Sequence, residues 1–240
     1  MKANAKANQK RIEIPIDRKV HMAETLRRRI VSMELPPGAP VDELALCEEF
    51  GLSRPPVREL LRQIAAEGYL ELETNRAPRV AAMDFESLRS FFLAAPLIYV
   101  ATTQLAAGRA VPAEILKLKQ IQSAFRQAIE SGDVEGRVLH NDEFHLEIGR
   151  MAHNSYLMAS LRRLLIDHAR LGKMFFQHPA TADMQQDLEE ACRQHDEIIE
   201  AIERRDPDQA GRLIREHFEL SRRRMAEYAA PQGIEGDIAC

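Results

Sequence analysis

The sequence contains no tryptophan, and only 5% of its 240 residues are aromatic. Its three cysteines, Cys47, Cys192 and Cys240, are odd in number and far apart, which argues against a disulfide framework or a cysteine-type zinc module. Glycine and proline, at 11 and 12 residues, are too few for a collagen-like or low-complexity chain. With 45% hydrophobic and 29% charged residues, the composition is that of a globular, helix-rich protein with an aliphatic core.

The first residues are basic and polar, and no apolar segment typical of a secretory signal follows them. A cytoplasmic location is therefore expected. One stretch, residues 90–108, has no charged side chain over nearly the length that spans a bilayer. Because it contains a proline, two threonines and a glutamine, we interpret it as a buried core helix and expect no membrane partner.

Charge divides the chain into two parts. Residues 1–80 hold 14 Lys and Arg against 12 Asp and Glu, whereas residues 81–240 hold 19 against 25. A basic first third and an acidic remainder suggest two domains with different partners. Helix and loop signals predict a flexible tail over 1–16, a first domain over 17–81, a second over 84–229 and a loose tail over 230–240.

The first domain has the pattern of a winged helix-turn-helix. Helical spacing runs from Val20 to Met33, Asp42 is placed to cap a helix ending at Phe50, and a third helix begins after Ser53. Two short strands, 69–72 and 77–80, follow. In this fold the third helix enters the major groove of DNA and the hairpin lies along the backbone.

The third helix carries arginines at four-residue spacing, Arg54, Arg58 and Arg62, on the face opposite its apolar side. An ordinary solvated basic face is the alternative interpretation. The turn before the helix and the hairpin after it favour a role in DNA binding.

The second domain shows six amphipathic segments separated by Gly, Pro, Asp and Asn, which predicts a mostly α protein ending in an antiparallel six-helix bundle. His145, His195 and His217 lie on the apolar faces of three of these helices. Each buried imidazole needs a polar partner, and one shared metal ion would satisfy all three. Three separately hydrogen-bonded core histidines are the alternative. Asn141 and Asp142, one turn before His145, could each supply an oxygen ligand.

The first domain resembles the GntR family of bacterial transcription regulators. The resemblance rests on the runs LPPGAPVDE from Leu35, FGLSRPPVRELL from Phe50 and EGYL from Glu67. It implies that Ser53, Arg54 and Arg58 contact operator DNA in a homodimer on a pseudo-palindromic site. With the helix face and the hairpin added, the expected DNA contacts are Ser53, Arg54, Arg58, Arg62, Asn75 and Arg76. Pro55 departs from the family, which has a hydroxyl residue there, as do Ala77 and Pro78, where the wing usually has a glycine.

The second domain resembles the FCD effector domain of the FadR branch of that family. The similar segments are NDEFH at 141–145, HNSYL at 153–157, HDEIIEAI at 195–202 and REH at 215–217. The resemblance implies that Asn141, His145, His195 and His217 hold a divalent metal, zinc first and nickel second, with Asp142 as the alternative oxygen ligand. At the position of Asn141 the family usually has an acidic residue. Where this chain has Ala95 and Tyr99, the family commonly has an Arg and a Glu.

The family resemblance also implies a small organic acid as effector. The candidates for holding it are polar residues of the fourth bundle helix, Arg163, His168, Arg170 and Lys173. The alternative is that these side chains form an ordinary solvated face.

Taken together, these features favour a DNA-binding transcription regulator, a repressor controlled by a small organic acid, and not an enzyme. A DNA-binding dimer with a purely structural metal is one alternative. A metal-dependent hydrolase is another, because three histidine ligands with an open position also describe hydrolytic zinc. Neither H-E-x-x-H nor a G-x-S-x-G elbow occurs to support the hydrolase.

Overall fold

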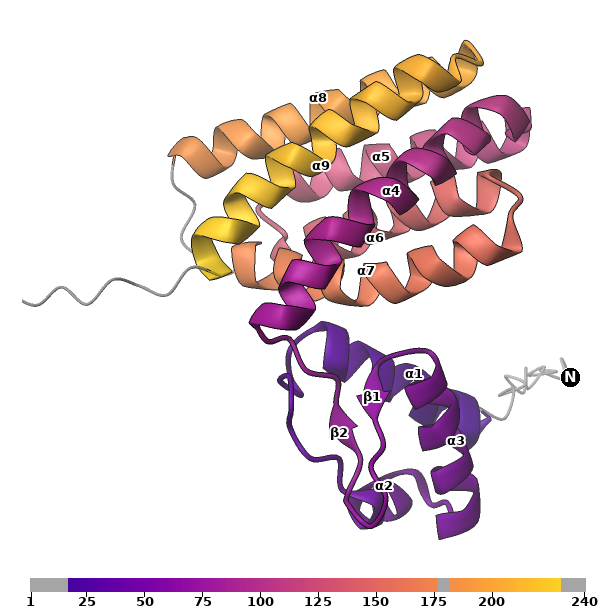
Figure 1. Ribbon diagram of the computed structural model, residues 1–240, viewed down its shortest axis with the longest axis vertical. Coiled ribbons are helices and arrows are strands. Elements are labelled where there is room, and N and C mark those ends of the chain that lie inside the picture. The colour runs from indigo at the N-terminus through magenta and orange to yellow at the C-terminus, as the bar shows by residue number, and fades with distance from the viewer. Residues whose placement is uncertain (1–16, 177–181, 230–240) are drawn as a thin grey trace, which may run out of the picture.

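The computed structural model describes residues 17–176 and 182–229, which form two domains (Figure 1). The tails expected at 1–16 and 230–240 lie outside the described residues. The smaller domain contains α1 (Arg18–Val31), α2 (Glu43–Phe50), α3 (Arg54–Ala66) and an antiparallel hairpin of β1 (Leu70–Glu71) and β2 (Arg79–Val80). This arrangement confirms the winged helix-turn-helix, with strands shorter than the sequence suggested.

Short-range capping sets the helix-turn-helix. The Asp42 carboxylate accepts hydrogen bonds from the backbone N–H groups of Leu44 and Ala45 and so begins α2. Gly51 ends α2 in the left-handed conformation, with φ of 61°, which makes the tight turn into α3. Apolar side chains of the three helices and the hairpin then form one core, which includes Met22, Leu26, Ile30, Leu46, Val57, Leu61, Ile64 and Val80.

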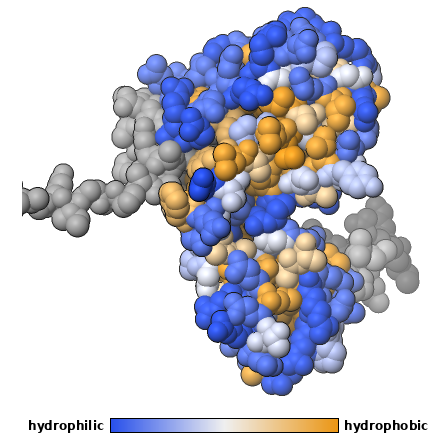
Figure 2. Space-filling model, viewed as in Figure 1, coloured by the Kyte–Doolittle hydropathy of each residue, from blue (hydrophilic) through white to orange (hydrophobic). Residues whose placement is uncertain are grey.

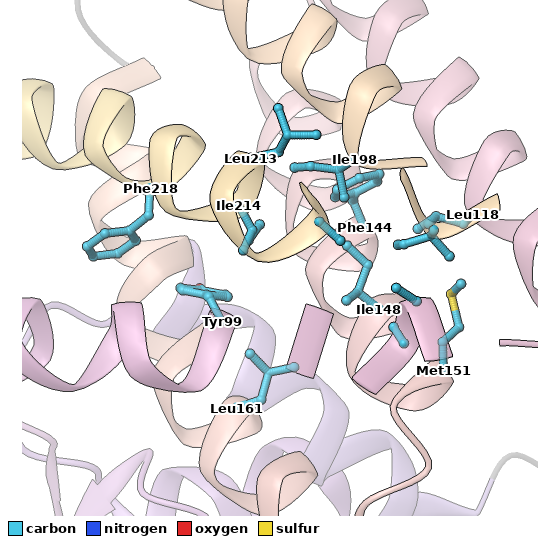
Figure 3. Packing of buried hydrophobic residues seen from close by; sticks show 14 of the residues in the cluster. Tyr99, Leu118, Phe144, Ile148, Met151, Leu161, Ile198, Leu213, Ile214 and Phe218 are labelled. Atoms are coloured by element: carbon cyan, nitrogen blue, oxygen red, sulfur yellow. The ribbon is translucent and has the colours of Figure 1, made fainter. Parts of the chain in front are cut away.

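The larger domain is the predicted bundle. Its helices are α4 (Phe85–Arg109), α5 (Pro112–Glu130), α6 (Val134–Met151), α7 (Ser155–Phe176), α8 (Ala182–Glu203) and α9 (Pro207–Ala229). Helix α4 packs against α6, α7 and α9, while α5 packs against α6 and α8. Figure 3 shows the resulting core, where Tyr99 of α4 and Phe218 of α9 lie beside aliphatic side chains from several other helices.

Helix α4 is the uncharged segment noted in the sequence. Among the described helices it alone has the length and hydropathy of a membrane span. One side of it is buried in the bundle through residues that include Phe91, Ala95 and Tyr99. On its other side Leu93 and Leu97 are 67% and 66% exposed. Figure 2 shows a hydrophobic area on the face of the bundle seen in this view. The structure therefore uses α4 as a bundle helix with one exposed apolar side.

The two domains meet where α1 packs against α7. The fully buried Arg170 of α7 donates a hydrogen bond of 3.2 Å to the carbonyl of Ala81, in the connection between the domains. Its guanidinium is also paired with Asp167 at 3.0 Å. Nearby, Gly68 has φ of +96°, and an added Cβ there would lie 2.2 Å from Cδ of Arg163. Helix α7 thus touches both the connection and the small domain.

Candidate functional site

The residues expected to contact DNA all lie on the surface of the small domain. Helix α3 buries Val57, Leu61 and Ile64, so its opposite side faces solvent. The expected residues Ser53, Arg54, Arg58, Arg62, Asn75 and Arg76 are all exposed. The turn of the hairpin places Asn75 in the left-handed region, with φ of 63°.

The ion pairs of Arg58 and Arg62 are weak enough for a phosphate group to replace the carboxylate partner. Arg58 pairs with Glu43 at 2.8 Å and Arg62 with Glu59 at 3.5 Å, all four side chains being exposed or half-buried. Such surface pairs contribute only about 0–1 kcal/mol. Arg54 has no ion pair within the described chain, and Ser53, at the N-cap of α3, makes no capping hydrogen bond with its hydroxyl. These groups are free to bind an anion beside the positive end of the α3 dipole.

The three histidines singled out in the sequence converge inside the bundle. One ring nitrogen from each of His145, His195 and His217 lies within 4.8 Å of the others, and all three side chains are buried. His145 comes from α6, His195 from α8 and His217 from α9, so the cluster joins three helices. Phe144 stacks on the His195 ring, with centroids 3.8 Å apart and planes 9° from parallel.

Two glutamines orient the rings of His195 and His217. The His195 Nδ1 lies 2.9 Å from Oε1 of Gln122, and the His217 Nδ1 lies 3.0 Å from Oε1 of Gln194. Each amide is itself fixed, because the Gln122 Nε2 donates to the carbonyl of Cys192 at 2.8 Å and the Gln194 Nε2 donates to Glu190 at 2.9 Å. An Oε1 only accepts, so each Nδ1 must carry the hydrogen.

The opposite nitrogens of these two rings therefore present lone pairs. The Nε2 atoms of His195 and His217 lie 3.2 Å apart. A hydrogen bond between them would need one ring to be protonated twice. Burial lowers the pKa of His217 to about 3 and that of His195 well below its usual range, so both rings are neutral near pH 7. Two facing lone pairs repel unless a positive centre lies between them.

The third histidine has no polar partner. Both ring nitrogens of His145 are buried and unpaired within the described chain. Burial, and then the neighbouring histidines, lower its pKa well below the usual range, so it too is neutral. Nitrogen ligands of a tetrahedral zinc stand about 3.3 Å apart, given Zn–N bonds of about 2.0–2.1 Å. The three imidazole donors, the 3.2 Å spacing of the His195 and His217 Nε2 atoms and the unpaired His145 all fit a divalent metal such as zinc.

The two expected oxygen ligands differ in position. Asn141 lies one turn before His145 on α6 and is half-buried. Asp142 does not join the histidine group. It lines a separate cavity that also contains Tyr69 of the small domain. Burial raises the pKa of Asp142 well above its ordinary value.

The four effector candidates on α7 lie in different surroundings. His168 is buried beside the cluster, with its ring centroid 5.1 Å from that of His145 and its Nδ1 2.8 Å from the Tyr99 hydroxyl. Arg170 is buried at the domain junction. Arg163 is exposed and paired with Asp167 at 2.8 Å, and Lys173 lies 3.9 Å from Glu135. A solvated face therefore does not describe His168 or Arg170.

Comparison with known families identifies both domains. The family described as "Bacterial regulatory proteins, gntR family" matches residues 19–80, and "FCD domain" matches residues 97–220. The chain belongs to the GntR family and carries an FCD domain. It is a DNA-binding transcription regulator rather than an enzyme, as the sequence analysis expected.

Curated relatives of this GntR-family regulator span most of its length. The HTH-type transcriptional repressor RspR of Escherichia coli is 25% identical over 205 residues, which cover 85% of this chain and 86% of the relative. A probable D-xylose utilization operon transcriptional repressor of Paenarthrobacter nicotinovorans is 28% identical, over 78% of this chain and 80% of the relative. The Glc operon transcriptional activator of Escherichia coli is 26% identical, over 85% and 87%.

Solved structures share the fold of the regulator. Escherichia coli McbR/YncC matches with a TM-score of 0.76 at 18% identity, over 90% of this chain and 100% of that one. A putative GntR transcriptional regulator from Rhodococcus matches with a TM-score of 0.68 at 17% identity, over 90% and 99%.

Sequence reasoning missed Gln122 and Gln194, and it missed the hydrogen bond that joins the Tyr99 hydroxyl to His168. Gln122 is fully enclosed although polar, and it lies one turn from Leu118 on the buried side of α5. A lone amide on an apolar helix face is a signal that could have found it. Nothing local distinguishes Gln194, because its partner His217 lies 23 residues away.

Proposed function

We propose that this regulator is a homodimeric repressor whose operator binding is controlled by a small organic acid bound beside a divalent metal, zinc first and nickel second. The observation that carries the proposal is the geometry of the histidine cluster. Two neutral imidazoles face each other with lone pairs 3.2 Å apart, and a third, His145, has two buried nitrogens without partners. Such an arrangement is costly without a cation.

In this proposal His145, His195 and His217 are the nitrogen ligands and Asn141 supplies the oxygen. When bound, the metal offers a positive charge and an open coordination position to a carboxylate. His168 lies beside the cluster, with its ring centroid 5.1 Å from that of His145. It is neutral near pH 7 because burial lowers its pKa to about 4. Its Nδ1 is engaged with the Tyr99 hydroxyl, so its other nitrogen is the group offered to the acid.

Helix α7 connects the proposed acid site with the domain that binds DNA, because it contacts both. It carries His168 beside the cluster and, two residues on, Arg170 against the Ala81 carbonyl. Nε and Nη2 of Arg170 are buried without partners within the described chain, so this side chain can take a new acceptor. A switch of this kind requires a coupling of about 1–3 kcal/mol between acid and operator. Arg163 and Lys173, at the surface of the same helix, are secondary candidates for holding the acid.

The small domain binds the operator through the exposed side of α3 and the hairpin. The proposed contacts are Ser53, Arg54, Arg58, Arg62, Asn75 and Arg76. Two-fold symmetry of a dimer would match a pseudo-palindromic operator. Repression is favoured because two of the three relatives described above are named as repressors. A chromosomal operator also implies a cytoplasmic protein.

Fluorescence anisotropy tests the proposal. An inverted repeat is first selected from a random DNA library by the wild-type protein. Its affinity is then measured with zinc-loaded protein, chelated protein and the His195→Ala variant, each against a panel of small carboxylic acids. We expect at least one acid to weaken DNA binding by the zinc-loaded protein alone. If zinc raises stability but no acid alters DNA affinity, the metal is structural and the effector part of the proposal is wrong.

A further inference from the structure

A cavity of about 360 Å³ lies at the junction of the two domains. Its apolar wall consists of Val31 from the small domain and Leu146, Leu165 and Ile166 from the bundle. In Figure 1 this is the region where α1 faces α7. The cavity is separate from the histidine cluster, because none of the three clustered histidines lines it.

The polar lining of the cavity contains one neutralised pair and two groups without partners. Arg27 and Glu67 bind each other through two hydrogen bonds of 2.7 Å. Arg162, by contrast, makes no ion pair or hydrogen bond within the described chain, and neither does the carboxyl group of Asp142. The Oδ1 of Asp142 is buried without any donor. The cavity therefore holds one unpaired cation and one unpaired acceptor.

Tyr69 lines the cavity together with these two groups. Burial raises the pKa of this phenol, and the surrounding side chains act on it as well, since Arg27 lowers it, Glu67 and Asp142 raise it and Arg162 lowers it. Tyr69 comes from the small domain, whereas Asp142 and Arg162 come from α6 and α7. A molecule placed among them would touch both domains at once.

The lining specifies the chemistry of that molecule. An unpaired guanidinium recognises a carboxylate, and a buried oxygen acceptor needs a hydroxyl or ammonium donor. The four aliphatic side chains need an apolar group, and the volume lies in the range of small-molecule sites. We propose that the domain junction binds an aliphatic carboxylate that carries a hydroxyl or ammonium group next to the carboxylate. This second site is independent of the metal and goes beyond the effector site proposed above.

Isothermal titration calorimetry on the full-length protein tests the site with three isosteric probes. L-Leucine and L-2-hydroxy-4-methylpentanoate carry the donor, and 4-methylpentanoate lacks it. We expect one or both of the first two to bind with one site per chain, and 4-methylpentanoate to bind up to about tenfold more weakly, the upper value for one hydrogen bond. The stronger of the two donor probes identifies the ammonium or the hydroxyl as the group recognised.

Variants assign the ligand to the junction. Arg162→Ala should weaken binding about tenfold through loss of a charge-assisted pair. Arg89→Ala is the matched control, because Arg89 is also exposed and without an ion pair in the described chain but does not line the cavity. His195→Ala, which removes the metal site, should leave the affinity unchanged.

Three results would overturn the inference. The first is that no probe binds the wild-type protein, and the second is that Arg89→Ala and Arg162→Ala weaken binding equally. The third is loss of binding in His195→Ala with Arg162→Ala unaffected, which would place the ligand in the metal site instead. Each titration is run on zinc-loaded and on chelated protein, so that failure of the junction site and failure of the metal-dependent effector site give different results.

Discussion

The Nε2 atoms of His195 and His217 face each other across 3.2 Å, and the glutamines behind the two rings hold them in that orientation. Stacking of Phe144 on His195 adds a rigid apolar wall. In the proposed metal site these two nitrogens are therefore already held in place, so little movement of the two rings would accompany the binding of an ion. Outer groups of this kind fix the tautomer of a ligating histidine and raise its affinity for the metal.

The first prediction concerns metal content. Protein purified without a histidine tag should contain about one equivalent of zinc or nickel per chain, as for a site with three or four protein ligands. His195→Ala should lose it, because only His145 and His217 then remain from the group. His153→Ala is the control, since His153 is exposed, pairs with Glu114 and lies outside the cluster. Elemental analysis decides: a metal-free wild-type protein would leave the three histidines as core residues.

The second prediction concerns the glutamines. Gln194→Met removes the acceptor behind His217 while keeping the volume, so the ring can rotate or adopt the other tautomer. We expect metal affinity to fall about 10–100-fold, as is usual when such a partner is lost. Gln185→Met on the same helix should have no effect, because Gln185 is exposed and, among the residues that the structure describes, is hydrogen-bonded only to Glu189. Competition with a chelating indicator measures both, and equal affinities would contradict the orienting role.

Helix boundaries could be predicted from the sequence because capping is local. Asp42, Asp84 and Asp133 each accept hydrogen bonds from backbone N–H groups two or three residues ahead, and each begins a helix, Asp42 as the sequence predicted. Gly51 and Gly132 follow helix ends in the left-handed conformation. These rules need only a few neighbouring residues, so the order of elements followed from them together with the apolar spacing.

The candidate site was predictable only in part. Apolar spacing placed the three histidines on buried helix faces, but Gln122 reaches His195 across 73 positions of sequence. Local patterns carry no information on such a contact. Arg170 was wrongly grouped with a possible solvated face, because charged side chains are rarely buried without a partner. The structure buries it by supplying Asp167 and the Ala81 carbonyl, and the second of these lies in another part of the chain.

The third prediction concerns DNA. Arg58→Ala should weaken operator binding by about 1–3 kcal/mol. The slope of log affinity against log salt concentration should also fall by about one, as for the loss of one phosphate contact. Glu43→Gln should act in the opposite direction and tighten binding up to about fivefold, because it frees Arg58 from a surface pair worth at most about 1 kcal/mol and removes a negative charge beside it.

Anisotropy titrations over a range of salt concentrations separate these effects. Arg89→Ala, in the bundle and without an ion pair in the described chain, is the control for loss of one positive charge. If Glu43→Gln weakens binding as Arg58→Ala does, the pair with Glu43 positions Arg58 for DNA, and the exchange of carboxylate for phosphate is wrong.

The fourth prediction compares two helical glycines. Gly149 of α6 lies against α7, and an added Cβ would stand 2.3 Å from Cδ2 of Leu161, a side chain that is fully buried. Gly149→Ala should therefore lower the free energy of unfolding by about 1–2 kcal/mol, since overpacking outweighs the gain in helix propensity.

Gly108, near the end of α4, has no atom within 4 Å of its added Cβ. Gly108→Ala should raise the free energy of unfolding by about 0.5 kcal/mol, because alanine restricts the unfolded chain. Urea denaturation of zinc-loaded protein measures both, and an unchanged or raised stability of Gly149→Ala would show that contact with Leu161 does not control the packing of α6 on α7.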